Sequence, residues 1–475
     1  MKKTVLVTGN FNVLHPGHIR LLKFARTFSK TLLVGVFSDK LAGNAVDVPE
    51  DLRLESVASI KLVDKSFLIS TSLSDCIKSL KPDVIVKGKE FEGQYNQESE
   101  IIESYGGELI FSSGEIGFST SSNSEYRLSI PPATRELIRS FSIRHQFSTS
   151  SLKHIIDKIA KLKVCVIGDT IVDQYIDCFP LGMSQEEPTL VVSPQETKDF
   201  LGGAGIVASH AAQLGASTRF LSVVGSDHVR DLAATELDRC NVDYSFVVDN
   251  ARPTTLKQRF RSHGKSLLRV STLSQQAISD HLQSIIFSEL EQTIKDTDLV
   301  VFSDFNYGCL PQPLVNRVIN LCNDHNIMMS ADSQSSSQFG DISRFKGVHL
   351  ITPTEREARL ALQNYDDGLV VLADKLMTIT SAKNILLKLG SDGMIAQLVQ
   401  KQDGLRHTER LDALNMNPID VSGAGDSVLI IASLALAAGA NLWQASLLGS
   451  VAAFIQVGRV GNIPIKSSEI IQALS

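Results

Sequence analysis

A stretch of eight residues near the end of the chain, 420–427 (DVSGAGDS), strongly constrains what this sequence can fold into. A run of small and apolar residues, 428–440, follows it and predicts a buried helix. The glycines on either side of Ala424 allow a tight bend, so successive N–H groups can point into one cavity at the helix start. The helix dipole adds partial positive charge there. The pattern predicts an anion seat formed by Gly423, Ala424 and Gly425.

Asp426 lies in the first turn of this predicted helix. A carboxylate at the rim of an anion seat can accept the proton of an attacking sugar hydroxyl during phosphoryl transfer. A carboxylate in a first helical turn can also simply cap the helix. The stretch alone is compatible with both interpretations, and the rest of the chain has to decide between them.

The composition is that of a globular protein with two to four domains, since the chain has 475 residues, 43% hydrophobic and 21% charged. The net charge of −6 provides no basic field for nucleic acid, so we expect no nucleic-acid partner. Six cysteines without a C-x-x-C pair favour reduced thiols and a cytoplasmic location. The most apolar run, 428–440, is too short to span a bilayer, so we expect no membrane partner.

The first 130 residues alternate short β-rich runs with amphipathic stretches such as 19–28 and 50–60. This rhythm predicts a first domain, 1–130, with a parallel sheet covered by helices on both faces. Ligands of such sheets bind at the carboxyl ends of the strands. The expected strands are 4–8, 32–37, 66–69, 84–86 and 108–111.

Residues 9–18 (GNFNVLHPGH) follow the first expected strand. Pro16 suits the first turn of a helix, and His15 and His18 are spaced to share one helical face. Two imidazoles at a helix start could hold the pyrophosphate that a nucleoside triphosphate releases, or they could be surface or capping histidines. The absence of the Glu of an H-E-x-x-H motif disfavours zinc.

This stretch resembles the G-x-F-D-x-L-H-x-G-H signature of the cytidylyltransferase-like nucleotidyltransferases. Residues 38–40 (SDK), 82–88 (PDVIVKG) and 117–121 (GFSTS) are also similar to segments of that family. The resemblance implies a Rossmann-like fold and transfer of a nucleotidyl group. Asn12 stands where the family usually has Asp, so the shape is kept and a charge is lost.

In nucleotidyl transfer the attacking phosphate is already an anion, so catalysis needs positioning and charge stabilisation rather than a general base. The resemblance implies that His15, His18 and Lys87 stabilise this charge. It also implies nucleotide contacts from Gly9, Phe11, Asn12, Gly17, Asp39, Arg53, Ser119 and Thr120.

Residues 131–150 predict a linker, because two prolines interrupt the periodicity at its start and a polar, Ser-rich run follows. A second domain, 151–475, then begins with an expected helix, 152–161, and an expected strand, 164–168. Further on, the runs 255–261 and 266–271 predict a β-hairpin.

The second domain is similar to the ribokinase-like (PfkB) sugar kinases through 168–175 (GDTIVDQY), 351–357 (ITPTERE), 389–393 (LGSDG) and the opening stretch. It closely resembles the kinase half of the bifunctional heptose-7-phosphate kinase/heptose-1-phosphate adenylyltransferases, with the order of the two domains reversed. The resemblance implies an α/β domain with a small β lid, through which two chains could form a homodimer.

The same resemblance implies roles for individual residues of the second domain. Asp426 would be the catalytic base, and Glu357 would orient Mg²⁺ indirectly, although a solvent-facing Glu is the alternative. The nucleotide would contact Thr352, Gly390, Gly393, Gly423, Ala424 and Gly425. The sugar substrate would contact Asp173, Gly202, Gly203, Lys257, Arg259 and Asp304. For Asp173 the alternative is a turn cap, and for Lys257 and Arg259 it is a polar outer strand face.

Ile206 stands where the related motif has an amide, so we expect an apolar position in the sugar pocket and leave the sugar open. The sequence thus predicts a bifunctional enzyme of nucleotide-sugar synthesis. One domain would phosphorylate a sugar or sugar phosphate with ATP and Mg²⁺. The other would transfer a nucleotidyl group, AMP by preference and CMP as the alternative, to a sugar 1-phosphate. A different class of function, in which one domain is a degenerate binding or regulatory module, also fits Asn12 and Ile206.

Overall fold

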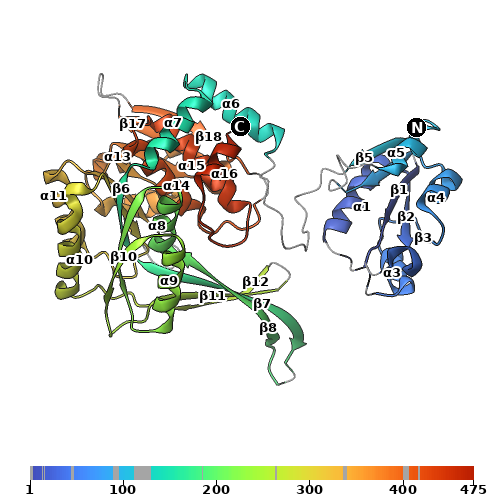
Figure 1. Cartoon of the computed structure of the whole chain (residues 1–475), viewed down its shortest axis with the longest axis horizontal. Coiled ribbons are helices and arrows are strands. Elements are labelled where there is room, and N and C mark those ends of the chain that lie inside the picture. The colour runs from blue at the N-terminus through green and yellow to red at the C-terminus, as the bar shows by residue number, and fades with distance from the viewer. Residues whose placement is uncertain are drawn as a thin grey trace. The chain divides into compact units, whose positions relative to one another are not determined.

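The computed structural model forms two compact units, Met1–Glu125 and Tyr126–Ser475 (Figure 1). The residues it describes are 4–12, 14, 16–43, 46, 48–88, 96–111, 130–184, 186–262, 265–334, 340–399, 406–415 and 418–474.

In the described part of the first unit, five strands form a parallel sheet in the order β3-β2-β1-β4-β5. The central strand β1 pairs on both sides, so that Val5 lies opposite Leu32 of β2 and Val84 of β4. From β1 the chain adds β2 and β3 on one side and then β4 and β5 on the other, so the strand order reverses between β1 and β4. Sheets of this kind bind ligands at such a point. The strands are β1 (Thr4–Gly9), β2 (Thr31–Phe37), β3 (Lys65–Ile69), β4 (Val84–Lys87) and β5 (Glu108–Phe111).

Helices cover both faces of this sheet because its inner strands are apolar on both sides. Val5 and Val7 of β1 pack in one cluster with Leu22, whereas Leu6 packs on the opposite face with Ile77. The predicted parallel sheet with two covered faces is confirmed. The helices are α1 (Pro16–Phe28), α2 (Asp39–Ala42), α3 (Glu50–Ala58), α4 (Leu73–Leu80) and α5 (Gln97–Glu103).

The second unit is built on a larger sheet, for which the described residues give nine strands in the order β10-β9-β6-β13-β14-β15-β16-β17-β18. The strands from β10 to β16 are parallel, and β17 and β18 are antiparallel additions at one edge. Their bounds are β6 (Lys163–Gly168), β9 (Ser217–Val224), β10 (Asp243–Val248), β13 (Leu299–Asp304), β14 (Met328–Ser333), β15 (Leu350–Ile351), β16 (Asn384–Lys388), β17 (Met394–Val399) and β18 (Arg406–Leu411).

Two hydrophobic cores lie on the two faces of this sheet. Val164 and Val166 of β6 belong to one core, and Cys165 and Ile167 belong to the other. The first core includes α7 (Thr149–Ile159), α8 (Gly203–Gln213), α9 (His228–Arg239), α14 (Ala424–Ala437), α15 (Leu442–Val457) and α16 (Ser467–Ala473). The second includes α10 (Asp280–Thr293), α11 (Gln312–Asp324), α12 (Glu355–Leu362) and α13 (Leu369–Thr380). Short 3-10 turns lie at Ile294–Asp296, Ile342–Arg344 and Gly390–Asp392.

A smaller sheet carries the predicted hairpin and projects from the second unit (Figure 1). Its strands are β7 (Thr170–Met183), β8 (Leu190–Gly202), β11 (Thr255–Ser262) and β12 (Lys265–Thr272). Among the residues described, their order is β12-β11-β7-β8. We call these four strands the lid sheet.

The segment that we expected to be a linker, 131–150, forms helix α6 (Pro132–Arg144) and the start of α7. Phe141 is 1% exposed in the core of the second unit, and Thr134 donates a hydrogen bond to the Leu414 carbonyl. The ring of His145 stacks on Trp443. Pro132 is tolerated because it occupies the first helical turn, where its missing N–H has no intrahelical partner.

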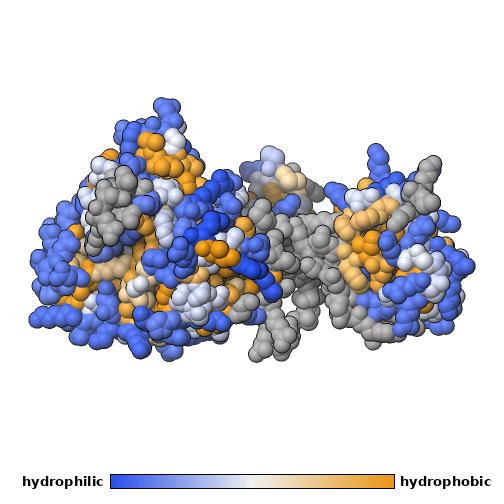
Figure 2. Space-filling model, turned by 90° about the horizontal axis from the view of Figure 1, so that it is seen from above, coloured by the Kyte–Doolittle hydropathy of each residue, from blue (hydrophilic) through white to orange (hydrophobic). Residues whose placement is uncertain are grey.

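Hydrophilic side chains dominate the face of the second unit that Figure 2 shows, with apolar patches between them. Within the described ranges, no helix combines the length and the apolar character needed to cross a bilayer.

Candidate functional site

The glycine turn that we expect to be an anion seat lies at the start of α14. Gly423 precedes the helix with φ of 72°, a conformation that favours glycine, and a Cβ at this position would clash with the Asn462 amide. A Cβ at position 425 would lie 3.1 Å from the Lys388 ammonium, so the turn and this side chain are in close contact. The positive φ and the clash at position 423 together require glycine there.

Asp426 lies in the first turn of α14 and is 5% exposed. Its Oδ1 accepts a hydrogen bond of 2.9 Å from Gln334 Nε2. Burial, together with the nearby Asp332 carboxylate, raises the pKa of Asp426 to about 7, against the opposing charges of Lys388 and Lys257. A carboxylate with such a pKa can accept a proton from a substrate at neutral pH and release it again.

Asp173, on β7, is held near this seat by contacts from three other segments. Asn462 Nδ2 donates to Asp173 Oδ2 over 3.2 Å, and Arg259 lies 3.5 Å from Oδ1. A side chain at position 202 would clash with this carboxylate, so Gly202 allows the close approach. Gly203 has φ of 56°, and a Cβ there would lie 2.5 Å from the Asp169 carbonyl. Burial raises the pKa of Asp173, which shows how strongly the site is desolvated.

Lys257 and Arg259 lie on β11 with side chains on the same face of the lid sheet. Arg259 Nη1 donates to Ser422 Oγ over 2.6 Å, and the guanidinium lies over the Tyr175 ring. The Lys257 ammonium lies 5.2 Å from the centre of the Phe305 ring. These cations face the groups around Asp173 and the glycine turn, so the alternative of a polar outer face does not describe them.

The expected nucleotide side contains a pocket of about 610 Å³. Gly390 lines it, and Lys388 forms part of its wall beside Leu389. Gly393 has φ of 85°, and its position against the Leu411 carbonyl leaves no room for a side chain. Thr352 is fully buried and donates from Oγ1 to Asp332 over 3.1 Å. Thr352 therefore lies behind Asp332 in the polar layer that supports the anion seat.

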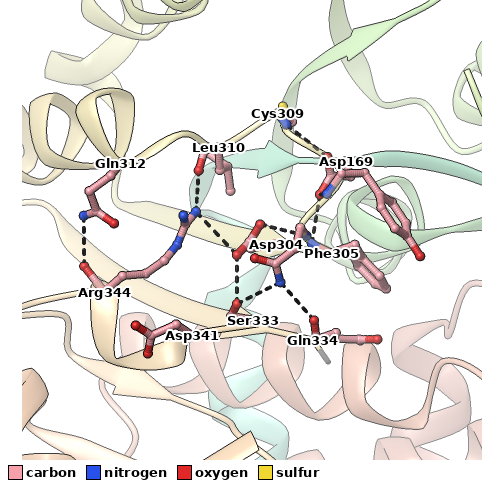
Figure 3. Close-up of polar contacts among 12 residues, drawn as sticks. Asp169, Asp304, Phe305, Cys309, Leu310, Gln312, Ser333, Gln334, Asp341 and Arg344 are labelled. Atoms are coloured by element: carbon pink, nitrogen blue, oxygen red, sulfur yellow. Dashed lines mark hydrogen bonds and ion pairs between the residues drawn. The ribbon is translucent and has the colours of Figure 1, made fainter. Parts of the chain in front are cut away.

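Asp304, expected to contact the sugar, lies 2% exposed in a buried polar cluster (Figure 3). Its carboxylate accepts hydrogen bonds from Ser333 Oγ at 2.8 Å and from the Asn306 backbone N–H at 3.1 Å, and it lies 3.4 Å from Arg344 Nη2. In the same cluster, Asp169 accepts backbone N–H groups of the loop that follows β13. Asp304 and Asp169 thus both hold the loop that follows β13 in place through their carboxylates.

Glu357 completes a capping box with Thr354 at the start of α12, and its Oε2 accepts the Thr354 N–H at 2.7 Å. It is 6% exposed, so a solvent-facing position is excluded. In the described segments, no group of three or more His, Cys, Asp or Glu side chains is arranged to hold a metal ion.

Ile206 lies on α8, has no exposed surface and belongs to the first hydrophobic core of the second unit. The structure therefore places it in the core and gives no support to the expected apolar position in the sugar pocket.

In the first unit, the loop after β1 is held by a fully buried arginine. Arg53 donates to the carbonyls of Asn10 and Val48 and to Asp39. Asn12 Oδ1 accepts the Val48 N–H at 2.9 Å. Arg53 and Asn12, both expected to contact nucleotide, thus fix the shape of this loop in the structure.

The other described residues that we expect to contact the nucleotide in the first unit lie close to the carboxyl ends of β1 and β4. Phe11 packs against Gly9, and its ring centre lies 5.0 Å from that of His18 at the start of α1, which also contains Gly17. Lys87 ends β4 and donates to Asn96 and Glu98. His15, Ser119 and Thr120 lie outside the described residues.

Sequence reasoning missed four side chains around the anion seat: Asp332, Gln334, Lys388 and Asn462. Lys388 carried a usable signal, because it is the one charged residue in the run 384–390 (NILLKLG), at the end of an otherwise apolar strand. The others come from segments far apart in sequence, and only the fold brings them together.

Comparisons with known families agree with the two units. The model of the pfkB family carbohydrate kinases matches residues 161–468, and the cytidylyltransferase-like model matches residues 6–153. The predicted order, with the nucleotidyltransferase-like domain first, is confirmed.

Similar curated proteins include the Bifunctional protein HldE of Desulfatibacillum aliphaticivorans, 32% identical over 65% of this chain and 62% of that protein. The Bifunctional protein HldE of Helicobacter hepaticus is 29% identical over 65% of this chain and 63% of that protein. The chain thus spans less than two thirds of the length of these relatives. Among solved structures, Arabidopsis thaliana ribokinase complexed with ribose and ATP superimposes with a TM-score of 0.52 and 18% identity, covering 66% of this chain and 99% of that one. This likeness supports the ribokinase-like fold.

Proposed function

The chain belongs to the pfkB family of carbohydrate kinases, and from that premise we propose that its second unit transfers the γ-phosphoryl group of ATP to a sugar or sugar phosphate. The observation that carries this proposal is Asp426, a buried carboxylate with a pKa of about 7 in the first turn of α14, beside the glycine turn. The substrate hydroxyl attacks the γ-phosphorus, its proton passes to Asp426, and ADP leaves.

The positions of the other groups around the seat support a role for each of them. Asp173 accepts hydrogen bonds from sugar hydroxyls, with Gly202 and Gly203 leaving space for it. Lys257 and Arg259 bind a phosphate on the sugar, because two cations on one strand face match a dianion. Asp304 holds the loop after β13 in place beside the sugar-binding residues. Gly390 and Gly393 border the nucleotide, and Gly423, Ala424 and Gly425 hold the transferring group through backbone N–H groups.

Magnesium arrives bound to ATP and supplies charge neutralisation of the phosphates when present. Carboxylates are suitable ligands for it. Glu357 and Asp332 are close enough to influence each other's charge, and Glu357 is the group we assign to Mg²⁺ through water.

The first unit transfers a nucleotidyl group to a sugar 1-phosphate: a phosphate oxygen attacks the α-phosphorus of the triphosphate, and pyrophosphate leaves. His18 and Lys87, with His15 and the segment containing Ser119 and Thr120, stabilise the charge on the α-phosphate. Gly9, Phe11, Gly17 and Asp39 shape the nucleotide site, with Asn12 and Arg53 behind them. The resemblance to the heptose enzymes favours AMP transfer and a heptose phosphate substrate, and CTP is the alternative donor.

The packing of α6 in the core of the second unit supports the following domain limits. The nucleotidyltransferase domain occupies approximately 1–130, and the kinase domain, together with α6, occupies the rest of the chain. The protein acts in the cytoplasm on small molecules.

Two chains form a homodimer through the lid sheet, because Phe179, Leu181, Met183 and Leu268 expose apolar side chains there. Leu268→Lys should convert the dimer to a monomer in light scattering, and an unchanged mass would reject this interface.

The test uses the full chain with Mg²⁺, ATP or CTP, and a panel of sugars and sugar phosphates. ADP and pyrophosphate are measured separately by mass spectrometry. We expect ADP with at least one sugar substrate and pyrophosphate with at least one sugar 1-phosphate. Nucleotide binding by calorimetry without either product would instead support a binding or regulatory module, the second class of function that Asn12 leaves open.

A further inference from the structure

Lys388 is a buried cation at the junction of the two halves of the kinase site. It ends β16, and its side chain is 11% exposed. Its ammonium lies 3.1 Å and 3.0 Å from the two carboxylate oxygens of Asp332 on β14. It also lies 3.1 Å from where a Cβ at Gly425 would stand, directly against the anion seat.

The same side chain lines the 610 Å³ pocket together with Leu389, Gly390 and Thr354. In the proposed kinase reaction this pocket takes the nucleotide, and Asp426 accepts the proton of the sugar hydroxyl. Lys388 lines the pocket, contacts the glycine turn and lies close enough to Asp426 to influence its charge. The three atoms nearest to a Cβ built at Gly425 all belong to Lys388.

The charges around Lys388 favour its ionised form. Burial lowers the pKa of Lys388, but the carboxylates of Asp332 and Glu357 outweigh burial and raise the pKa above its ordinary value. An ammonium group has three N–H donors. The hydrogen bonds that the described residues give it both end on Asp332, which leaves one donor for a phosphate oxygen.

We propose that Lys388 is a catalytic residue of the kinase reaction, donating a hydrogen bond to the transferring phosphoryl group and stabilising the charge that develops on its oxygens. Asp332 and Thr352 are positioning residues for this ammonium, because Thr352 Oγ1 donates to the carboxylate that holds it. This inference rests on the proposed kinase function.

The alternative is that Lys388 and Asp332 form a purely structural ion pair. Removing the charge of Lys388 alone, or the charges of both residues, distinguishes this alternative from a catalytic role. If Lys388 only neutralises Asp332, then removing both charges together removes the need for it, since buried pairs can often be replaced by neutral groups without loss of stability. If Lys388 contacts the phosphoryl group, the neutral pair stays inactive.

The experiment compares Lys388→Met, Lys388→Arg and the double variant Asp332→Asn/Lys388→Met in the full chain. The matched control is Lys383→Met, which removes an exposed lysine five positions earlier. ADP formation is measured with MgATP and the sugar phosphate that the wild-type protein uses. We expect Lys388→Met to lower kcat by about 100- to 1000-fold, as for other donors that stabilise transition-state charge. Lys388→Arg should retain part of the rate, the double variant should stay as slow as the single one, and Lys383→Met should match the wild type.

A second readout is the pH profile of kcat/KM for the residual activity. The charged groups that face Asp426 are Asp332 from β14, Lys388 from β16, Lys257 from β11 and Asp173 from β7. Removing Lys388 takes away a positive charge that favours the carboxylate, so the acid limb should move to higher pH. Removing Lys383 should leave the limb in place.

The outcomes separate cleanly. A wild-type protein that forms no ADP refutes the proposed kinase function itself. If the wild type is active, two results overturn the role of Lys388 and leave the proposed kinase function standing. One is a kcat for Lys388→Met within threefold of the wild-type value, and the other is a kcat for the double variant within tenfold of it. If Lys388→Met is unfolded by circular dichroism, Lys388→Gln replaces it and is judged by the same thresholds.

Discussion

The two proposed phosphate sites of this protein use their buried charges differently. In the first unit, the buried charge is Arg53, and it is engaged by two carbonyls and Asp39, so it fixes the shape of the loop after β1. In the second unit, the buried Asp426 has a pKa near neutrality and accepts a hydrogen bond from a single amide side chain. The difference matches the proposed chemistries: an anionic phosphate nucleophile needs a shaped site, whereas a hydroxyl nucleophile needs a proton acceptor.

The largest effect should come from removing that acceptor. Asp426→Asn keeps the size and the hydrogen-bonding capacity of the side chain but cannot accept the proton. We expect ADP formation to fall by about 100- to 10,000-fold, with pyrophosphate release unchanged. The two products are assayed on the same preparation. Kinase activity within threefold of the wild type would contradict the assignment of Asp426 as base.

The corresponding change in the first unit is His18→Ala. Loss of one pre-placed donor to the α-phosphate should slow pyrophosphate release by about 100- to 1000-fold and leave ADP formation unaffected. Lys23→Ala, on the same helix, is the control. Equal rates for both variants would show that α1 does not present His18 to the triphosphate. Zinc bound stoichiometrically and lost in His18→Ala would support a metal site instead.

The comparison also predicts different pH profiles for the two activities. The pKa of Asp426 is raised to about 7, so the carboxylate is protonated, and inactive as a base, below that pH. The kcat/KM for ADP formation should therefore fall about tenfold per pH unit below about 7 and level off above it. Pyrophosphate release should lack this acid limb. A kinase profile that stays flat from pH 5 to 8 would contradict protonation of Asp426 near neutrality.

The sequence predicted the parts of the fold that depend on local patterns. Strands such as 32–37 and 108–111 are predictable to within a residue of their observed bounds because they are short runs of mostly consecutive apolar residues, as in buried parallel strands. The glycine turn was also predictable, since its conformation depends on Gly423 and Gly425 themselves. Asn462 and Gln334 were not predictable in the same way, because they reach the site from distant segments through tertiary packing.

Two misreadings have a common physical cause. The Ser-rich, Pro-containing segment 131–150 was interpreted as a linker from composition, yet Phe141 and Ile138 anchor it in a core whose other members are far away in sequence. Ile206 was interpreted as facing a substrate from its motif position, but the surrounding core determines where α8 points it. In both cases tertiary contacts outweigh what the local sequence indicates.

The last prediction concerns α6 and the limits of the second unit, and it should leave both activities of the folded protein unchanged. Phe141 is 1% exposed and packs in the core, whereas Ile143 on the same helix is 65% exposed. Phe141→Ala should lower the free energy of unfolding of the second unit by about 3–5 kcal/mol, because it leaves a cavity where a large side chain was buried. Ile143→Ala, the matched control, should change it by about 0.5 kcal/mol or less. Denaturant unfolding of the full chain, followed through Trp443 fluorescence, measures both variants, because the His145 ring stacks on Trp443 at the end of α6.

The packing of α6 also predicts the stability of two fragments. A fragment that begins at residue 146 should be less stable than one that begins at residue 129, since the shorter fragment lacks both Phe141 and the hydrogen bond from Thr134 to Leu414. Equal stability of the two fragments, or equal effects of the two alanine variants, would show that α6 contributes nothing to this core and would restore the linker interpretation.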